Sequence, residues 1–179
     1  MQRFYAFLLK TIGWKGRLDA PILPKCVFCV APHTSNWDFV LGSIFIRSMG
    51  GKARVLMKKG WFFFPFGLFL RTLGCVPVDQ HNKMMTTKRL IRYFDKKSSC
   101  HLAITPEGTR KRNPKWKTGF YHIAMAVNVP ISVAYLDYKE KTIGILENFT
   151  PTGNKEKDLL YIKSLYKGIQ GRHPEQFAI

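Results

Sequence analysis

The sequence is poor in acidic residues and has no apolar run long enough to cross a membrane. Only 11 Asp and Glu oppose 29 Lys and Arg in 179 residues, which gives a formal net charge of +18. Such an excess attracts polyanions, whether nucleic acid, anionic lipid or a phosphorylated substrate, and does not say which. The aromatic stretch at residues 61–70 is too short for a transmembrane helix, which needs about 20 apolar residues. We therefore expect no membrane-spanning helix.

The four cysteines show neither the spacing of a disulfide framework nor that of a metal site. Cys26 and Cys29 form a CxxC, but they lie in a β-type run in which positions three apart point to opposite faces. No second CxxC or HxxxH completes a zinc set, and no cleavage site indicates secretion. We expect buried core thiols and no metal site.

Strand and helix patterns alternate along the chain, which favours an α/β fold with a mainly parallel sheet flanked by helices. Pro65 and Gly67 should interrupt one of the helices. Functional residues of such sheets gather on loops at the carboxyl ends of strands. We expect one domain over residues 21–179. The expected strands are 26–31, 53–57, 75–78, 100–105, 130–137 and 142–148, and the expected helices are 36–49, 61–72, 86–97, 118–127 and 156–169.

Residues 1–20 form an apolar stretch with basic residues around it. Phe4, Phe7, Leu8 and Ile12 recur at helical spacing, which predicts an amphipathic helix that docks in a membrane interface. A helix of the same pattern that packs on the domain core is the alternative, and the sequence leaves both open.

Residues 31–40, APHTSNWDFV, place His33 just after a predicted strand and Asp38 in the first turn of a predicted helix. In one interpretation Asp38 only caps the helix, with Ser35 as the N-cap residue. In the other, the carboxylate of Asp38 meets one nitrogen of the His33 ring and leaves the second nitrogen free to take a proton from a hydroxyl. Only Thr34 and Ser35 offer a hydroxyl nearby in sequence, so the hydroxyl could belong to the substrate.

Residues 104–110, ITPEGTR, predict a strand that enters a turn containing glycine. The backbone N–H groups of such a turn can bind an anion, and Arg110 offers a bidentate fork for phosphate. An ordinary polar turn is the alternative. The basic residues that follow, at 111, 112, 115 and 117, are expected to form a solvated face.

Together, HxxxxD and PEGTR, about seventy residues apart, resemble motifs of the glycerolipid acyltransferase family, of the 1-acylglycerol-3-phosphate acyltransferase or lysophospholipid acyltransferase type. Further blocks are similar in the same order: residues 57–59 with 65–67, residues 74–80 (GCVPVDQ) and residues 128–131 (NVPI). The resemblance covers roughly residues 26–135.

The resemblance implies transfer of a fatty acyl group from acyl-CoA or acyl-carrier protein to the hydroxyl of a lyso-lipid such as lysophosphatidic acid, in membrane phospholipid biosynthesis. His33 would be the general base and Asp38 would orient it, with no metal and no other cofactor. The acceptor phosphate would be bound by Glu107, Gly108, Thr109, Arg110 and Lys58. The acyl or membrane side would be formed by Trp61, Phe62, Phe66 and Pro130.

One position departs from the family pattern, because Gln80 stands where an arginine is expected. Either His81, Lys83 or Arg89 replaces the missing cation, or the acceptor is another lyso-lipid, such as a lyso-aminolipid. The resemblance and the charge together place the protein peripherally on the cytoplasmic face of a membrane, with a bacterial inner membrane as the expected one.

Two other classes fit part of the pattern. A basic nucleic-acid-binding module would account for the charge, but the aromatic residues cluster in one block and no recognised nucleic-acid motif is present, so we expect no specific nucleic-acid partner. A hydrolase would use the same His33–Asp38 pair with water in place of the acceptor alcohol.

Overall fold

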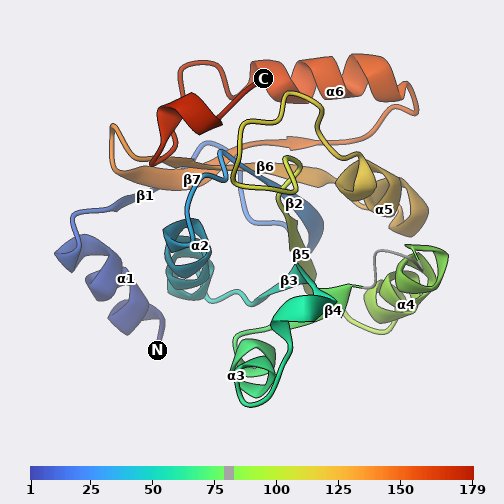
Figure 1. Ribbon diagram of the computed structural model, residues 1–179, viewed down its shortest axis with the longest axis horizontal. Coiled ribbons are helices and arrows are strands. Elements are labelled where there is room, and N and C mark those ends of the chain that lie inside the picture. The colour runs from blue at the N-terminus through green and yellow to red at the C-terminus, as the bar shows by residue number, and fades with distance from the viewer. Residues whose placement is uncertain (79–82) are drawn as a thin grey trace.

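The fold is a sheet between two layers of helices, seen in a computed structural model that describes residues 1–78 and 83–179, except the side chains of 58, 78 and 83–87 (Figure 1). The seven strands lie in the order β1-β7-β6-β2-β5-β3-β4. Every neighbouring pair is parallel except β6 and β7. The predicted α/β class with a mainly parallel sheet is therefore confirmed. The strands are β1 (Lys15–Leu18), β2 (Lys25–Ala31), β3 (Ala53–Lys58), β4 (Cys75–Val78), β5 (Cys100–Ile104), β6 (Ile131–Asp137) and β7 (Thr142–Phe149).

Helices cover both faces of this sheet. Helices α1 (Gln2–Thr11) and α2 (Trp37–Ser48) pack on one face, and α4 (Lys83–Asp95), α5 (Gly119–Val127) and α6 (Lys155–Ser164) pack on the other. In Figure 1, α2 and α6 lie on opposite sides of the sheet. Helix α3 (Phe66–Thr72) follows a short 3-10 turn, η1 (Lys59–Trp61), and a second such turn, η2 (Pro174–Gln176), lies near the C-terminus.

The central strand β2 is buried from both sides. Its side chains alternate, so Cys26 and Phe28 pack with α2, whereas Val27 and Cys29 belong to the larger core beneath α4, α5 and α6. Burial raises the pKa of the Cys26 and Cys29 thiols to about 12, which makes them unreactive near neutral pH. The prediction of core thiols is confirmed. Among the described residues, no group of three or more His, Cys, Asp or Glu is placed to hold a metal ion.

The N-terminal helix is shorter than the expected segment 1–20. Helix α1 ends at Thr11, because Gly13 takes a left-handed conformation with φ +77°, and Lys15–Leu18 then form strand β1 beside β7. Leu9 is buried against α2, so the helix packs on the domain core in part, whereas Phe4 and Phe7 are more than 60% exposed (63% and 65%) and docking in a membrane interface stays a prediction. None of the helices within residues 1–78 and 83–179 has both the length and the apolar character needed to span a bilayer.

The aromatic segment after β3 is divided before Pro65, between η1 and α3, whereas Gly67 lies inside α3 and does not interrupt it as expected. Gly67 lies so close to the preceding turn that a Cβ atom there would approach the carbonyl group of Phe62 to 2.7 Å, so the chain needs glycine at this position. In Figure 1, α3 projects beyond β3 and β4 at the lower edge of the molecule. Side chains of η1, of α3 and of the segment between them form what we call the aromatic surface: Trp61, Phe63, Phe64, Phe66, Leu68 and Phe69, each at least 38% exposed.

Candidate active site

His33 and Asp38 meet in the loop between β2 and α2. The His33 Nδ1 atom lies 3.1 Å from Oδ2 of Asp38. The His33 side chain is 22% exposed, whereas that of Asp38 is 3% exposed. Among the described residues, none forms a hydrogen bond with the second ring nitrogen, Nε2. The structure therefore shows an imidazole held on one side by a buried carboxylate, and its catalytic role stays a prediction.

The Asp38 carboxylate accepts hydrogen bonds at both oxygens. Oδ2 accepts the backbone N–H groups of Thr34 and Ser35, each at 2.9 Å, in addition to the contact with His33. Oδ1 accepts the phenol of Tyr138 at 2.6 Å. Asp38, in the first turn of α2, therefore binds two amides of the loop before the helix and orients His33 at the same time. The N-cap residue is Asn36 rather than Ser35, and its side chain makes no capping hydrogen bond.

Glu107 lies directly behind the His33 loop and is fully buried. Its Oε1 atom accepts the backbone N–H of His33 at 2.7 Å, and no described group bonds its Oε2 atom. The pKa of Glu107 is raised to about 8, mainly by burial and in part by the nearby charge of Asp38, against the opposing effect of the His33 N–H. The carboxyl is therefore mostly protonated at neutral pH. A fully buried carboxyl of this kind is not exposed to an acceptor phosphate. Glu107 therefore supports the His33 loop from inside the protein, which differs from its expected place in the anion site.

The turn after β5 presents the other predicted anion ligands. Gly108 has φ +64°, and Thr109 is exposed. The Arg110 guanidinium donates a hydrogen bond to the side-chain carbonyl of Asn36, which joins this turn to the His33 loop. Arg110 also lines an open hollow of about 370 Å³. The other lining residues are Thr34, Ser35, Asn36, Trp37, His173 and Gln176. A cationic side chain thus stands in a hollow that adjoins the His33–Asp38 pair.

The C-terminal segment closes one side of this hollow, which the sequence did not predict. The backbone N–H of His173 donates to the Thr34 hydroxyl at 3.2 Å. Gly171 packs so tightly that a Cβ atom there would lie 2.7 Å from the same hydroxyl oxygen. A separation of 139 residues between His173 and Thr34 leaves no local signal in the sequence.

Several predicted site residues are not among the described residues that line this hollow. Lys58 ends β3 at the same edge of the sheet, but its side chain lies outside the described residues, as do Gln80, His81 and the side chain of Lys83. Trp61, Phe62 and Phe66 belong to the segment of η1 and α3, where Trp61 and Phe66 form part of the aromatic surface.

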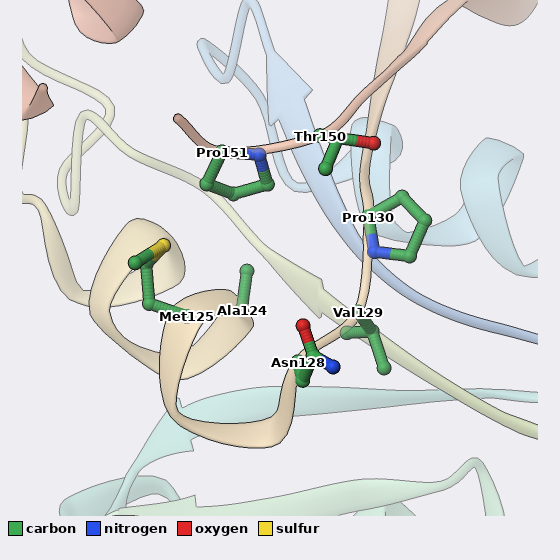
Figure 2. Close-up of a pocket in the computed structure, with 7 residues that line it drawn as sticks. All are labelled: Ala124, Met125, Asn128, Val129, Pro130, Thr150 and Pro151. Carbon is green, nitrogen blue, oxygen red and sulfur yellow. The ribbon is translucent and has the colours of Figure 1, made fainter. Parts of the chain in front are cut away.

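Pro130 lies at the opposite end of the sheet from His33. It directly precedes β6, whose first residue, Ile131, pairs with Val27 near the start of β2, whereas His33 follows the end of that strand. Figure 2 shows Pro130 beside Asn128 and Thr150 in a small cavity of about 80 Å³ between the end of α5 and the chain leaving β7. This position does not support the expected place of Pro130 on the acyl-binding side of the His33 site.

Comparison with known proteins relates this arrangement to lipid acyltransferases. The 1-acyl-sn-glycerol-3-phosphate acyltransferase of Escherichia coli (strain K12) is 30% identical over 109 residues, which are 57% of this chain and 43% of that protein. The enzyme of the same name from Salmonella typhimurium is 29% identical over 109 residues, with the same shares of 57% and 43%. The chain thus matches less than half the length of these curated relatives.

A solved structure shares the fold. The crystal structure of the 1-acyl-sn-glycerophosphate (LPA) acyltransferase PlsC from Thermotoga maritima superposes with a TM-score of 0.63 over 93% of this chain and 75% of that one, at 17% identity. A family model described as Acyltransferase matches residues 20–136, which include both the HxxxxD and the PEGTR motifs. Since that match spans well over half of the sequence, the chain belongs to the acyltransferase family.

Proposed function

We propose that this protein transfers a fatty acyl group from an acyl thioester to the hydroxyl group of a lysophospholipid. The observation that carries the proposal is the His33–Asp38 pair, joined at 3.1 Å, beside a hollow that contains the Arg110 guanidinium. The relatives named 1-acyl-sn-glycerol-3-phosphate acyltransferase support this substrate class.

The proposed reaction uses His33 as a general base. With Nδ1 held by Asp38, Nε2 takes the proton from the acceptor hydroxyl, and the acceptor oxygen attacks the carbonyl carbon of the thioester. The new ester C–O bond forms as the C–S bond breaks, and the leaving thiolate receives the proton from His33. No covalent acyl-enzyme is needed, because the attacking oxygen belongs to the acceptor. Nor does the proposed sequence of steps call on a metal ion or another cofactor.

The acceptor is proposed to carry an anionic headgroup, with lysophosphatidic acid as the first candidate. Arg110 lies in the hollow next to Thr34 and Ser35, where a guanidinium can form two parallel hydrogen bonds to a phosphate. A lyso-aminolipid is the alternative acceptor, because Gln80 replaces the arginine of the family pattern. The donor is proposed to be acyl-CoA or acyl-carrier protein.

The protein is proposed to bind the cytoplasmic face of a membrane peripherally. The aromatic surface exposes six large apolar side chains, including Phe64 at 83%, and the exposed basic residues Lys59 and Arg71 flank it. Phe4 and Phe7 on α1 add a second exposed apolar group. Aromatic side chains favour the membrane interface, and a net charge of +18 favours anionic lipid.

A transfer assay with purified protein tests the proposed reaction. One acyl-CoA and one acyl-carrier protein serve as donors, and lysophosphatidic acid, glycerol 3-phosphate and a lyso-aminolipid serve as acceptors in mixed micelles. His33→Ala should abolish transfer, because no base remains to take the hydroxyl proton. His122→Ala, at an exposed histidine on α5, is the matched control and should keep the wild-type rate. A fully active His33→Ala variant would refute the assignment, and thiol release that does not need a lyso-lipid would indicate a hydrolase.

A further inference from the structure

Tyr138 stands just past the end of β6 and contacts the candidate active site across 100 residues of sequence. Its hydroxyl donates to Oδ1 of Asp38 at 2.6 Å. The contact exists because β2 and β6 are neighbours, with Ala31 opposite Tyr135, so both strands end at the same edge. A distance of this size is typical of a strong hydrogen bond from a hydroxyl to a carboxylate.

The Tyr138 side chain is held from several sides. Its backbone N–H donates to the carbonyl of Gln170 at 2.8 Å, and the Trp14 ring packs edge-on against the phenol with 4.9 Å between ring centroids. Burial and the hydrogen bond to Asp38 raise the pKa of Tyr138, so its hydroxyl stays protonated and remains a donor across the working pH range. The donor is thus both fixed in place and permanent.

We propose that Tyr138 is a positioning residue that tunes the His33 base through Asp38. By occupying Oδ1 it fixes the plane of the carboxylate, so that Oδ2 faces Nδ1 of His33. By sharing the negative charge of Asp38 it also limits how tightly the carboxylate holds a protonated His33 ring. The role in catalysis rests on the proposed acyl transfer, whereas the electrostatic effect on His33 does not depend on the substrate.

Removal of the Tyr138 hydroxyl should shift the pH dependence of the transfer rate in one direction. Among the described residues, the ionisable groups that act on Asp38 or Tyr138 include Glu107 from the turn after β5 and Arg172 from the C-terminal segment, and both remain in place in a Tyr138→Phe variant. Without the donor, more of the negative charge of Asp38 acts on His33 and stabilises its protonated form. A higher pH is then needed to free the base, so the acidic limb of the pH–rate profile moves upward.

Tyr138→Phe is compared with Tyr121→Phe as a matched control. The Tyr121 hydroxyl donates to Asp158 at 2.8 Å, so this variant also loses one hydrogen bond from tyrosine to aspartate, but between α5 and α6. Tyr138→Phe should lower kcat about ten- to a hundredfold, keep both KM values within about twofold and move the acidic limb to higher pH. Tyr121→Phe should change none of these. An unchanged kcat in Tyr138→Phe, an unmoved acidic limb, or an equal loss in both variants would overturn the proposal.

A titration without substrate separates this proposal from the proposed function. The C2 proton of the His33 ring is followed by NMR as a function of pH, with His33→Ala used to assign the signal. Its midpoint should move to higher pH in Tyr138→Phe and stay in place in Tyr121→Phe. An unmoved midpoint overturns the tuning role even where acyl transfer is confirmed. Absence of transfer by the wild-type protein would instead refute the proposed function while the titration still decides the effect of Tyr138.

Discussion

Replacement of Glu107 by Gln should change how the stability of the protein depends on pH. The ordinary pKa of a glutamate carboxyl is 4.5, and burial raises the pKa of Glu107 to about 8 in the folded chain. Between these two values the folded state keeps a proton that the unfolded state has lost. The stability of the wild-type protein that comes from this group therefore falls as the pH rises through that range.

The size of the effect follows from the two pKa values. Each pH unit between them costs the wild-type protein about 1.4 kcal/mol, so a rise from about pH 5.5 to about pH 7.5 costs about 2.5 kcal/mol. In a protein of this size that free energy corresponds to a difference in Tm of about 5–10 °C. The side chain of Gln cannot titrate, and its carbonyl oxygen can still accept the backbone N–H of His33, which Glu107 binds at 2.7 Å.

The assay is thermal unfolding of both proteins at a series of pH values. The Tm of Glu107→Gln minus that of the wild type should rise by about 5–10 °C over this range, because every other titrating group cancels in the difference. Glu140→Gln removes an exposed carboxylate in the turn between β6 and β7. The Tm of this control variant should change with pH as the Tm of the wild type does. If the Tm of Glu107→Gln also changes with pH as that of the wild type does, the buried carboxyl does not keep its proton in the folded state, and the reasoning is refuted.

Three further substitutions test the anion site, the turn and the membrane surface. Arg110→Ala should raise the acceptor KM about tenfold and leave the donor KM unchanged, since it removes one cation from the hollow; steady-state kinetics that show equal changes for both substrates would contradict this. Gly108→Ala should lower the free energy of unfolding, measured in urea, by about 1 kcal/mol or more, because φ is +64° and the new Cβ would lie 2.6 Å from Cδ of Lys117. A variant as stable as the wild type would show that alanine is not strained at this position. Phe64→Ser should weaken co-sedimentation with anionic liposomes, whereas Leu160→Ser, at an exposed leucine of α6, should not; equal losses in both would exclude a specific role for the aromatic surface.

Most of the element pattern could be predicted from the sequence, because the central strands are buried on both faces and carry continuous apolar runs. The strand expected at 26–31 is β2 at Lys25–Ala31, and the helix expected at 118–127 is α5 at Gly119–Val127. Strand β1 gave no such signal. Its residues Lys15–Leu18 are all exposed at the edge of the sheet, so they show neither an apolar run nor an alternation, and only the pairing with β7 makes them a strand.

The candidate site was predictable where its residues are close in sequence, as His33 and Asp38 are. Tyr138 was not, because its contact with Asp38 depends on which strands are neighbours in the sheet, and sequence spacing does not determine that order. The turn at residues 107–110 follows β5, which is paired with β2, and therefore lies beside the His33 loop. The buried state of Glu107 could not be predicted, since a motif gives the type of a residue and not the direction of its side chain.

The Asp38 carboxylate lies in the first turn of α2 and holds both the loop amides before that helix and the His33 ring, so the orientation of the base depends on the folding of one helical turn. If the first turn of α2 frays, the amides of Thr34 and Ser35 lose their shared acceptor at the moment when the imidazole loses its own. Slow exchange of these two amide hydrogens with solvent would therefore measure how long the base stays preorganised, without any substrate present.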